Sequence, residues 1–214
     1  MITLLEALLA VAALATALML RPWRALGAEG PPWPWIVWML LMPLFWGADR
    51  IAAIPVVQPL SGACLLVLLM GWPLAMLALV PVAVLTALLA GLDAVQTLHR
   101  AVWLGVMPGT LGLLLGLAIR RWLPRHLFVY ILGRAFIGTL LATVAAGAAA
   151  LWLNAEQGTA FAPPGLAAGD LMLGRWLAAW GDAWLCGLLA AIFVAYRPHW
   201  LATWADRLYL QPPR

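Results

Sequence analysis

Uninterrupted apolar segments constrain this chain more strongly than any other feature of its sequence. They follow one another through most of its 214 residues, and Trp, Pro and Arg mark their ends. A helix of about 20 apolar residues crosses the roughly 30 Å hydrocarbon core of a bilayer. The segments therefore predict an all-α fold, a polytopic membrane bundle of about seven transmembrane helices. The predicted spans are residues 2–20, 34–46, 60–72, 73–91, 101–119, 127–153 and 171–196.

The composition leaves little room for a soluble domain. Only 9% of the residues are charged, whereas soluble domains carry about a quarter. We expect residues 1–199 to form a single transmembrane bundle. In residues 200–214, apolar side chains recur at helical spacing, which predicts a short amphipathic helix on the cytoplasmic interface. These side chains are Trp200, Leu201, Trp204 and Leu208.

The arginines predict the orientation of the bundle, because cytoplasmic loops of membrane proteins are enriched in arginine. If the N-terminus lies outside and the C-terminus in the cytoplasm, only Arg50 and Arg100 fall on the outer side. The cytoplasmic side then holds Arg21, Arg24, Arg120, Arg121, Arg125, Arg197, Arg207 and Arg214. Because these arginines lie at helix ends rather than on a soluble face, they do not predict binding to nucleic acid.

The segment between the second and third spans, residues 47–59, is the first functional pointer. It is apolar for the most part, but Pro55 and Pro59 resist a continuous helix. In a membrane, such backbone persists only where it is buried in protein or lines a cavity. The sequence leaves open whether this segment forms a re-entrant loop or a kinked helix.

Ionisable residues at membrane depth are the second pointer, because they are costly there and mark functional sites. On the last span, Trp176, Trp180 and Trp184 form a bulky stripe, and Asp182 lies on a different face with small residues. We expect that face to turn inward. Two interpretations of Asp182 stay open: a structural ion pair, with Arg134 as one partner, and a site for a cation or a proton.

Three further features complete the candidates. Glu6 and Arg175 lie at similar depth and are expected to neutralise each other. Both cysteines lie in apolar runs and predict no disulfide framework. A small residue at every fourth position of the sixth span allows close helix approach, either within the protein or against another membrane complex. This seam consists of Gly138, Ala142, Ala146 and Ala150.

Motifs of soluble enzymes are missing from the sequence. It has no P-loop, no GxSxG, no HExxH and no CxxC. An intramembrane enzyme would need a nucleophile with its base, or paired carboxylates at one depth. We therefore expect neither enzymatic activity nor a cofactor.

Several short motifs, taken in their order, resemble a known transporter family. Residues 60–63 (Leu-Ser-Gly-Ala), 68–73 (Leu-Leu-Met-Gly-Trp-Pro) and 106–109 (Val-Met-Pro-Gly) resemble the substrate-capture permeases of cobalt and nickel energy-coupling-factor transporters, the CbiM-like family. Residues 181–188 look like that family's Gly-Glu-Gly-Leu signature. Residues 123–131, with 206–210, are closer still to an uncharacterised bacterial branch. The similarity covers most of the chain.

This resemblance implies a seven-helix permease in the bacterial inner membrane that captures a transition-metal cation. It also implies two kinds of partner, a transmembrane coupling protein and ATPase subunits. The family binds metal through the N-terminal amine and two histidines, and Ile2 and Pro59 stand where those histidines would be. The leading hypothesis is a capture permease with an outward pocket. Its lining would be Asp49, Gln58, His99 and Asp182, with Cys64 and Cys186.

A rival hypothesis also follows from the sequence. Because both histidine positions are occupied by other residues, the chain could have kept the permease fold without transporting. It would then be a structural or assembly protein that docks onto another membrane complex.

Overall fold

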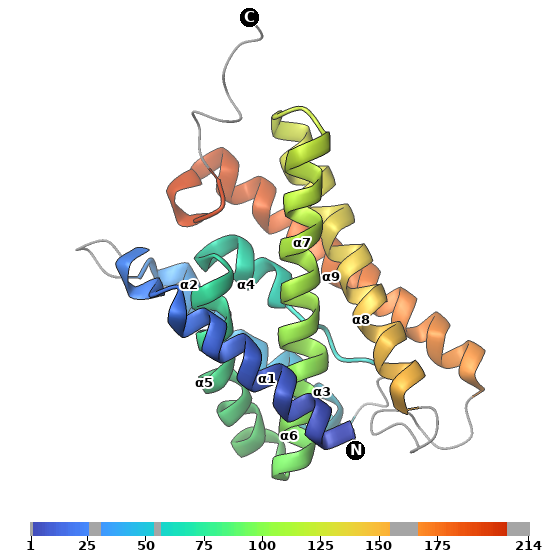
Figure 1. The fold of residues 1–214 in the computed structure, drawn as a ribbon. Coiled ribbons are helices and arrows are strands. Elements are labelled where there is room, and N and C mark those ends of the chain that lie inside the picture. The colour runs from blue at the N-terminus through green and yellow to red at the C-terminus, as the bar shows by residue number, and fades with distance from the viewer. Residues whose placement is uncertain (1, 26–30, 54–56, 155–166, 205–214) are drawn as a thin grey trace, which may run out of the picture.

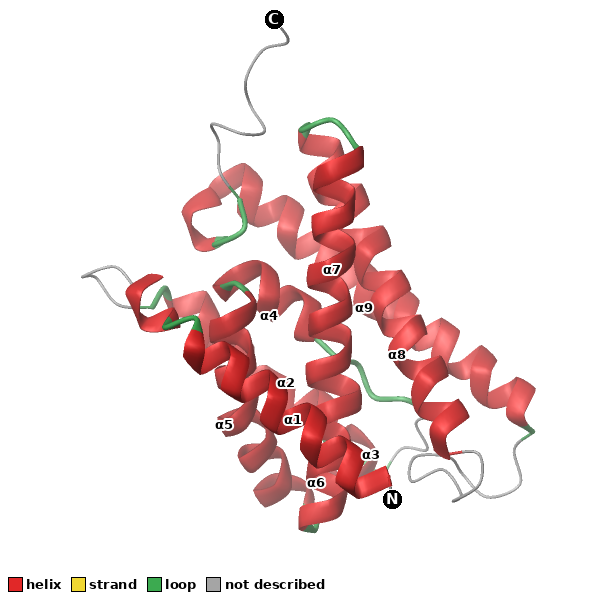
Figure 2. Ribbon diagram, viewed as in Figure 1, coloured by secondary structure: helices red, strands yellow, loops and turns green. Residues whose placement is uncertain are grey.

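The computed structural model describes residues 2–25, 31–53, 57–154 and 167–204, and the regular structure in these residues is helical throughout (Figure 2). Two π-helical stretches, Ala101–Val106 and Val129–Ile137, lead directly into α7 and α8. The α-helices are α1 (Ile2–Met19), α2 (Trp33–Trp46), α3 (Ala48–Ile51), α4 (Ala63–Met70), α5 (Trp72–Ala90), α6 (Ala94–Arg100), α7 (Met107–Trp122), α8 (Gly138–Asn154) and α9 (Ala168–Tyr196).

Five helical stretches of the described residues are long and apolar enough to cross a membrane. They are Ile2–Met19, Trp72–Ala90, Ala94–Trp122, Val129–Leu153 and Gly169–Tyr196. The all-α fold and the membrane character predicted from the sequence are thereby confirmed. Since α2 has only 14 residues and the third predicted span is not a continuous helix, the count of seven crossings stays a prediction.

The short helix α4 lies at the centre of the molecule. In Figure 1, the continuous helical stretch Ala94–Trp122, from α6 to α7, runs the length of the bundle, with α8 and α9 on one side and α1, α2 and α5 on the other. α4 packs against α5 and α7 between these groups, and all eight of its residues are buried. A helix that is apolar all round belongs in such a place.

The third predicted span, residues 60–72, consists of an extended segment followed by α4. We call α4 a half-helix because it is too short to cross the membrane. Residues 57–62 are not helical, and α4 begins only at Ala63. Gly62 (φ 66°) precedes the helix and Gly71 (φ 80°) follows it, in a backbone region that favours glycine. At about 1.5 Å per residue, α4 spans roughly 12 Å, less than half of the hydrocarbon core.

The chain's last described residues close the C-terminal end of α4. The amide of Ala202 donates to the Leu69 carbonyl at 2.9 Å, and Thr203 Oγ1 donates to the Leu68 carbonyl at 3.0 Å. Leu201 and Trp204 are buried. The predicted interfacial helix is therefore corrected for residues 201–204, which form a turn packed into the bundle. Residues 205–214, including Leu208, lie outside the described residues.

The small-residue seam of α8 faces the interior of the protein. Ala142, Ala146 and Ala150 are at most 1% exposed, and Gly138 is buried as well. α8 packs closely against α7 and α9. Of the two interpretations of this seam, the structure supports close approach within the protein, and docking of another complex through these residues is corrected.

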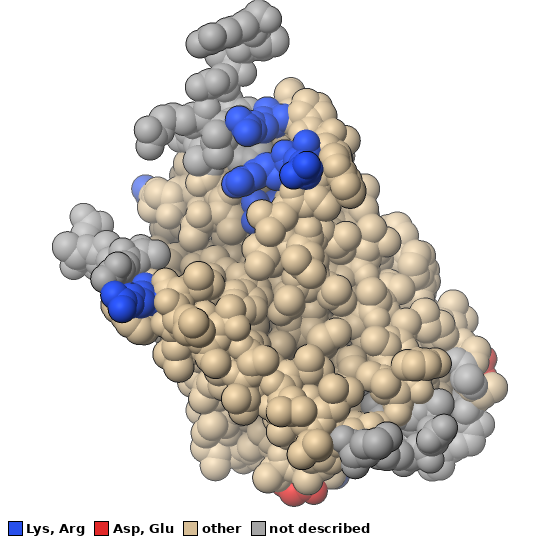
Figure 3. Space-filling model, viewed as in Figure 1, with Lys and Arg blue, Asp and Glu red and all other residues tan. Residues whose placement is uncertain are grey.

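Charged side chains separate toward opposite ends of the molecule. In Figure 3, basic side chains gather at the end where α7 terminates, and acidic atoms lie at the opposite end. The exposed arginines Arg120, Arg121 and Arg125 follow or end α7. The predicted orientation requires such an asymmetry, and the orientation itself stays a prediction.

Candidate functional site

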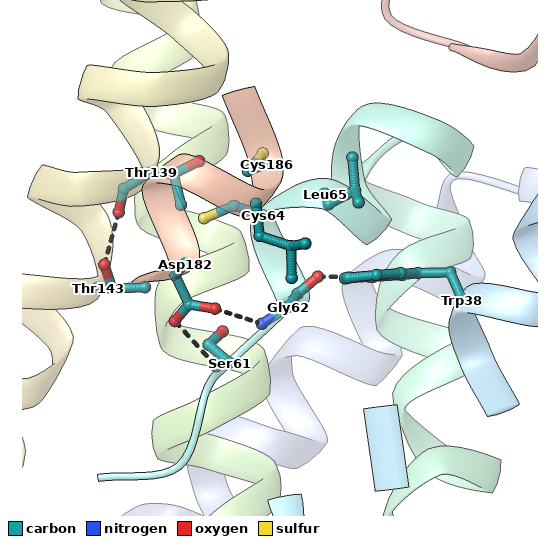
Figure 4. Close-up of a pocket in the computed structure, with 10 residues that line it drawn as sticks. Trp38, Ser61, Gly62, Cys64, Leu65, Thr139, Thr143, Asp182 and Cys186 are labelled. Carbon is teal, nitrogen blue, oxygen red and sulfur yellow. Dashed lines mark hydrogen bonds between the residues drawn. The ribbon is translucent and has the colours of Figure 1, made fainter. Parts of the chain in front are cut away.

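A buried carboxylate meets the N-terminus of the half-helix. Asp182, on α9, is 3% exposed. Its Oδ2 accepts from the Ser61 amide at 2.9 Å and its Oδ1 accepts from the Gly62 amide at 3.1 Å (Figure 4). The first amides of a helix have no partner within the helix and carry partial positive charge. The start of α4 therefore compensates the negative charge of Asp182.

Arg134 does not take the role that the sequence predicted for it. Its guanidinium carbon lies 5.8 Å from the centroid of the Tyr130 ring, and the side chain passes Gly116, where a Cβ would come within 2.8 Å of Nε. In the described residues, the partners of Asp182 are backbone amides. The expected ion pair between Asp182 and Arg134 is thus corrected.

The last two carbonyl groups of the extended segment accept hydrogen bonds from tryptophan. Trp46 Nε1 donates to the Ser61 carbonyl at 2.8 Å, and Trp38 Nε1 donates to the Gly62 carbonyl at 2.9 Å. Ser61 Oγ donates to the Leu104 carbonyl at 2.6 Å and accepts from the Ala63 amide. With polar groups paired inside the protein, non-helical backbone becomes stable at membrane depth.

A small cavity lies beside Asp182. Its volume of about 10 Å³ is enough for one water-sized species. Both cysteines of the chain reach it, although they are 5% and 2% exposed, and Cys64 Sγ donates to the Pro108 carbonyl at 3.4 Å. The lining residues are Trp38, Ser61, Gly62, Cys64, Leu65, Thr139, Thr143, Asp182, Leu185 and Cys186.

The other end of the extended segment is held by a buried arginine. Arg175 Nη1 donates to Gln58 Oε1 at 3.2 Å and to the Gly147 carbonyl at 3.0 Å. Arg175 and Asp182 are seven residues apart on α9, and therefore lie about two turns, or roughly 10 Å, apart along one face. α9 thus contacts both ends of the extended segment through polar side chains.

Glu6 has other partners than the arginine expected from the sequence. Its Oε1 lies 2.6 Å from His99 Nδ1 and accepts from Trp103 Nε1 at 2.8 Å. Arg175 donates instead to Gln58 and to a carbonyl of α8. The predicted neutralisation of Glu6 by Arg175 is therefore replaced by two separate networks.

A third network joins Asp49 on α3, outside the long spans, to Arg100 in the stretch Ala94–Trp122. Asp49 accepts from both terminal nitrogens of Arg100 at 2.7 Å, and Arg100 also donates to the Trp46 carbonyl. Partial burial raises the pKa of the Asp49 carboxyl, but the hydrogen bonds and charge of Arg100 outweigh burial and leave this pKa below its ordinary value.

The predicted pocket is thus divided among four places. Asp182, Cys64 and Cys186 come together at the small cavity. Gln58, His99 and Asp49 belong to the networks of Arg175, Glu6 and Arg100 respectively. Their role in substrate binding stays a prediction.

Sequence reasoning missed two hydroxyl groups at the cavity. Thr139 and Thr143 line it from α8, one helical turn apart. Two hydroxyl groups at this spacing lie on one face of a helix, and in an otherwise apolar span they could have indicated a polar site.

A larger, open cavity of about 440 Å³ adjoins the extended segment. Gln58 lines it together with residues of α2, α3 and α9. Leu60 borders this cavity, and the next residue, Ser61, borders the small one. The two cavities therefore lie along successive parts of the same extended segment.

The fold and this site define a polytopic helical membrane protein with an interrupted helix at its centre. No protein-family model, curated protein or solved structure matches the chain. The resemblance to the CbiM-like permeases consequently depends on the motifs of the sequence alone.

Proposed function

We propose that the chain is the substrate-capturing membrane subunit of a transporter of the energy-coupling-factor type. One observation carries the proposal: Asp182 is buried at membrane depth and binds the N-terminus of an interrupted helix. Interrupted helices and buried ionisable groups mark substrate and ion sites in membrane transporters. The resemblance of the sequence to capture permeases points to the same class.

The arrangement of the cavities supports a capture step. The larger cavity beside Gln58 provides room for an arriving substrate, and the smaller cavity beside Asp182 lies further along the same segment. We propose that substrate passes from the first to the second. Movement of residues 57–62 would control that passage, since this segment borders both cavities.

Energy for transport would come from other subunits. Since the sequence has no nucleotide-binding motif, we propose that a transmembrane coupling protein and ATPases associate with the chain in the bacterial inner membrane. Purification of the tagged chain from its native membrane tests this association. We expect ATPase subunits to co-purify. Recovery with a respiratory or photosynthetic complex, and without an ATPase, would contradict transport.

That contrary result would favour the second candidate function. Ile2 and Pro59 occupy the positions at which the resembling family has histidines, and this observation supports a bundle that docks without transporting. The docking surface would have to lie elsewhere than on the seam of α8, which is buried.

A further inference from the structure

The two thiol groups of this protein converge on one place. The sequence has two cysteines in 214 residues, one in the first turn of α4 and the other on α9. Both Cys64 and Cys186 line the small cavity beside Asp182. Figure 4 shows them entering it from different helices, next to Thr139.

A buried hydroxyl group also lines the cavity. Thr139 is 3% exposed, and among the described residues its hydroxyl oxygen has no hydrogen-bond partner of good geometry. The hydroxyl lies beside the thiols of both Cys64 and Cys186. The hydroxyl and the two thiols therefore converge on one small space between α4, α8 and α9.

The chemistry of the lining selects the kind of occupant. Thiolates are soft ligands that favour univalent copper, whereas zinc requires about four ligands. No group of three or more His, Cys, Asp or Glu side chains in the described parts of the chain is placed to hold a metal ion. Univalent copper differs from zinc because two sulfur ligands in a linear arrangement satisfy it.

We infer that the cavity binds one univalent copper ion between Cys64 Sγ and Cys186 Sγ, beside the Thr139 hydroxyl. The claim that univalent copper is the transported substrate rests on the proposed function. The claim that the protein binds univalent copper depends only on the two thiols and the cavity they share.

Binding exchanges protons for metal without electron transfer. Each thiol loses its proton when its sulfur bonds to copper, and Cys64 therefore gives up its hydrogen bond to the Pro108 carbonyl. Both protons leave to water, and the Asp182 carboxylate keeps its two backbone donors. Copper stays univalent. The two thiolates and copper together carry one negative charge, which lies beside the N-terminus of α4.

The binding test uses purified, reduced protein and silver(I), a redox-stable probe of univalent copper sites. We expect one silver ion per chain by elemental analysis, and protection of both thiols from an alkylating reagent added in denaturant, where the thiols of the silver-free chain become accessible. Cys64→Ser and Cys186→Ser should each lose the retained silver. Met42→Leu is the matched control, because it changes a buried sulfur that does not line the cavity and conserves its volume.

Three results would overturn the inference. The first is full silver retention in a variant that carries both Cys64→Ser and Cys186→Ser. The second is no silver retention by the reduced wild-type chain. The third is an intact mass two hydrogens lower than that of the chain with two free thiols, because this mass would reveal a disulfide. Thiol protection is measured on the wild-type chain, so it remains informative if a variant fails to fold. Copper uptake by cells is measured separately: binding without uptake contradicts the proposed function and leaves the site intact.

Discussion

Asp182 stabilises the start of α4 by accepting hydrogen bonds from two backbone amides. A carboxylate in a low-dielectric interior is costly unless it is paired and hydrogen-bonded. Unpaired backbone amides are costly there as well. Because the Ser61 and Gly62 amides donate to the two oxygens of Asp182, each group removes the cost of the other.

Replacing Asp182 by asparagine should destabilise the protein. The substitution removes the charge, and the side-chain NH₂ group of asparagine would face one of the two backbone amides that now donate to Asp182. Because that amide would lose its acceptor, we expect a loss of about 1–3 kcal/mol in the free energy of unfolding. Denaturant titration in detergent measures it. Asp170→Asn, at an exposed acid on the same helix, is the control and should change little. Equal stability of the two variants would contradict this role of Asp182.

The pair of Asp49 and Arg100 should make stability dependent on pH. Since the folded state lowers the pKa of Asp49, the pair stabilises the protein above the ordinary aspartate pKa of about 4, and this stability is lost as the pH falls through the lower folded value. Asp49→Asn should therefore destabilise the protein at neutral pH and progressively less in acid. Thermal unfolding across this pH range measures the effect. Arg50→Gln should leave the profile unchanged, because Arg50 is exposed and lies 4.0 Å from Asp49.

At the level of elements, the sequence predicted the continuous helices well and the interrupted one incompletely. Hydropathy placed the ends of α1 and α5 to within a few residues, because length and composition are local properties. The prolines before α4 predicted irregular backbone. The sequence did not predict that α4 would be a short helix bounded by Gly62 and Gly71. The partners of Asp182 lie 120 and 121 residues away, so no local pattern could identify them or replace the expected Arg134.

Close approach between the extended segment, α8 and α9 depends on a glycine. A Cβ at Gly147 would come within 2.8 Å of Gln58 Oε1 and 3.5 Å of Arg175 Cδ. Gly147→Ala should therefore separate Gln58 from Arg175 and cost about 1–3 kcal/mol of stability through overpacking. Thermal unfolding in detergent measures the change. Gly169→Ala, where a Cβ has no neighbour within 4 Å, is the control; a loss as large in this variant would show that tight packing at Gly147 is not the cause.

For the whole molecule, the asymmetry of charge predicts which end faces the cytoplasm. Arg121, near the end of α7, and Asp93, at the start of α6, are exposed at opposite ends of one long helical stretch. In intact cells, a membrane-impermeant maleimide should label Asp93→Cys and should label Arg121→Cys only after permeabilisation. The native cysteines are buried and should not react. Labelling in the reverse order would contradict the orientation.

The most direct test of this account is the exchange of backbone amides at the start of α4. If Asp182 holds the interrupted helix, the Ser61 and Gly62 amides should exchange slowly with deuterium in the wild-type protein. They should exchange faster in Asp182→Asn and slowly in Asp170→Asn. Hydrogen exchange of the peptide around residues 60–66, measured by mass spectrometry, gives this comparison. Rapid exchange in the wild-type chain, or the same slow exchange in all three proteins, would contradict the central role of Asp182.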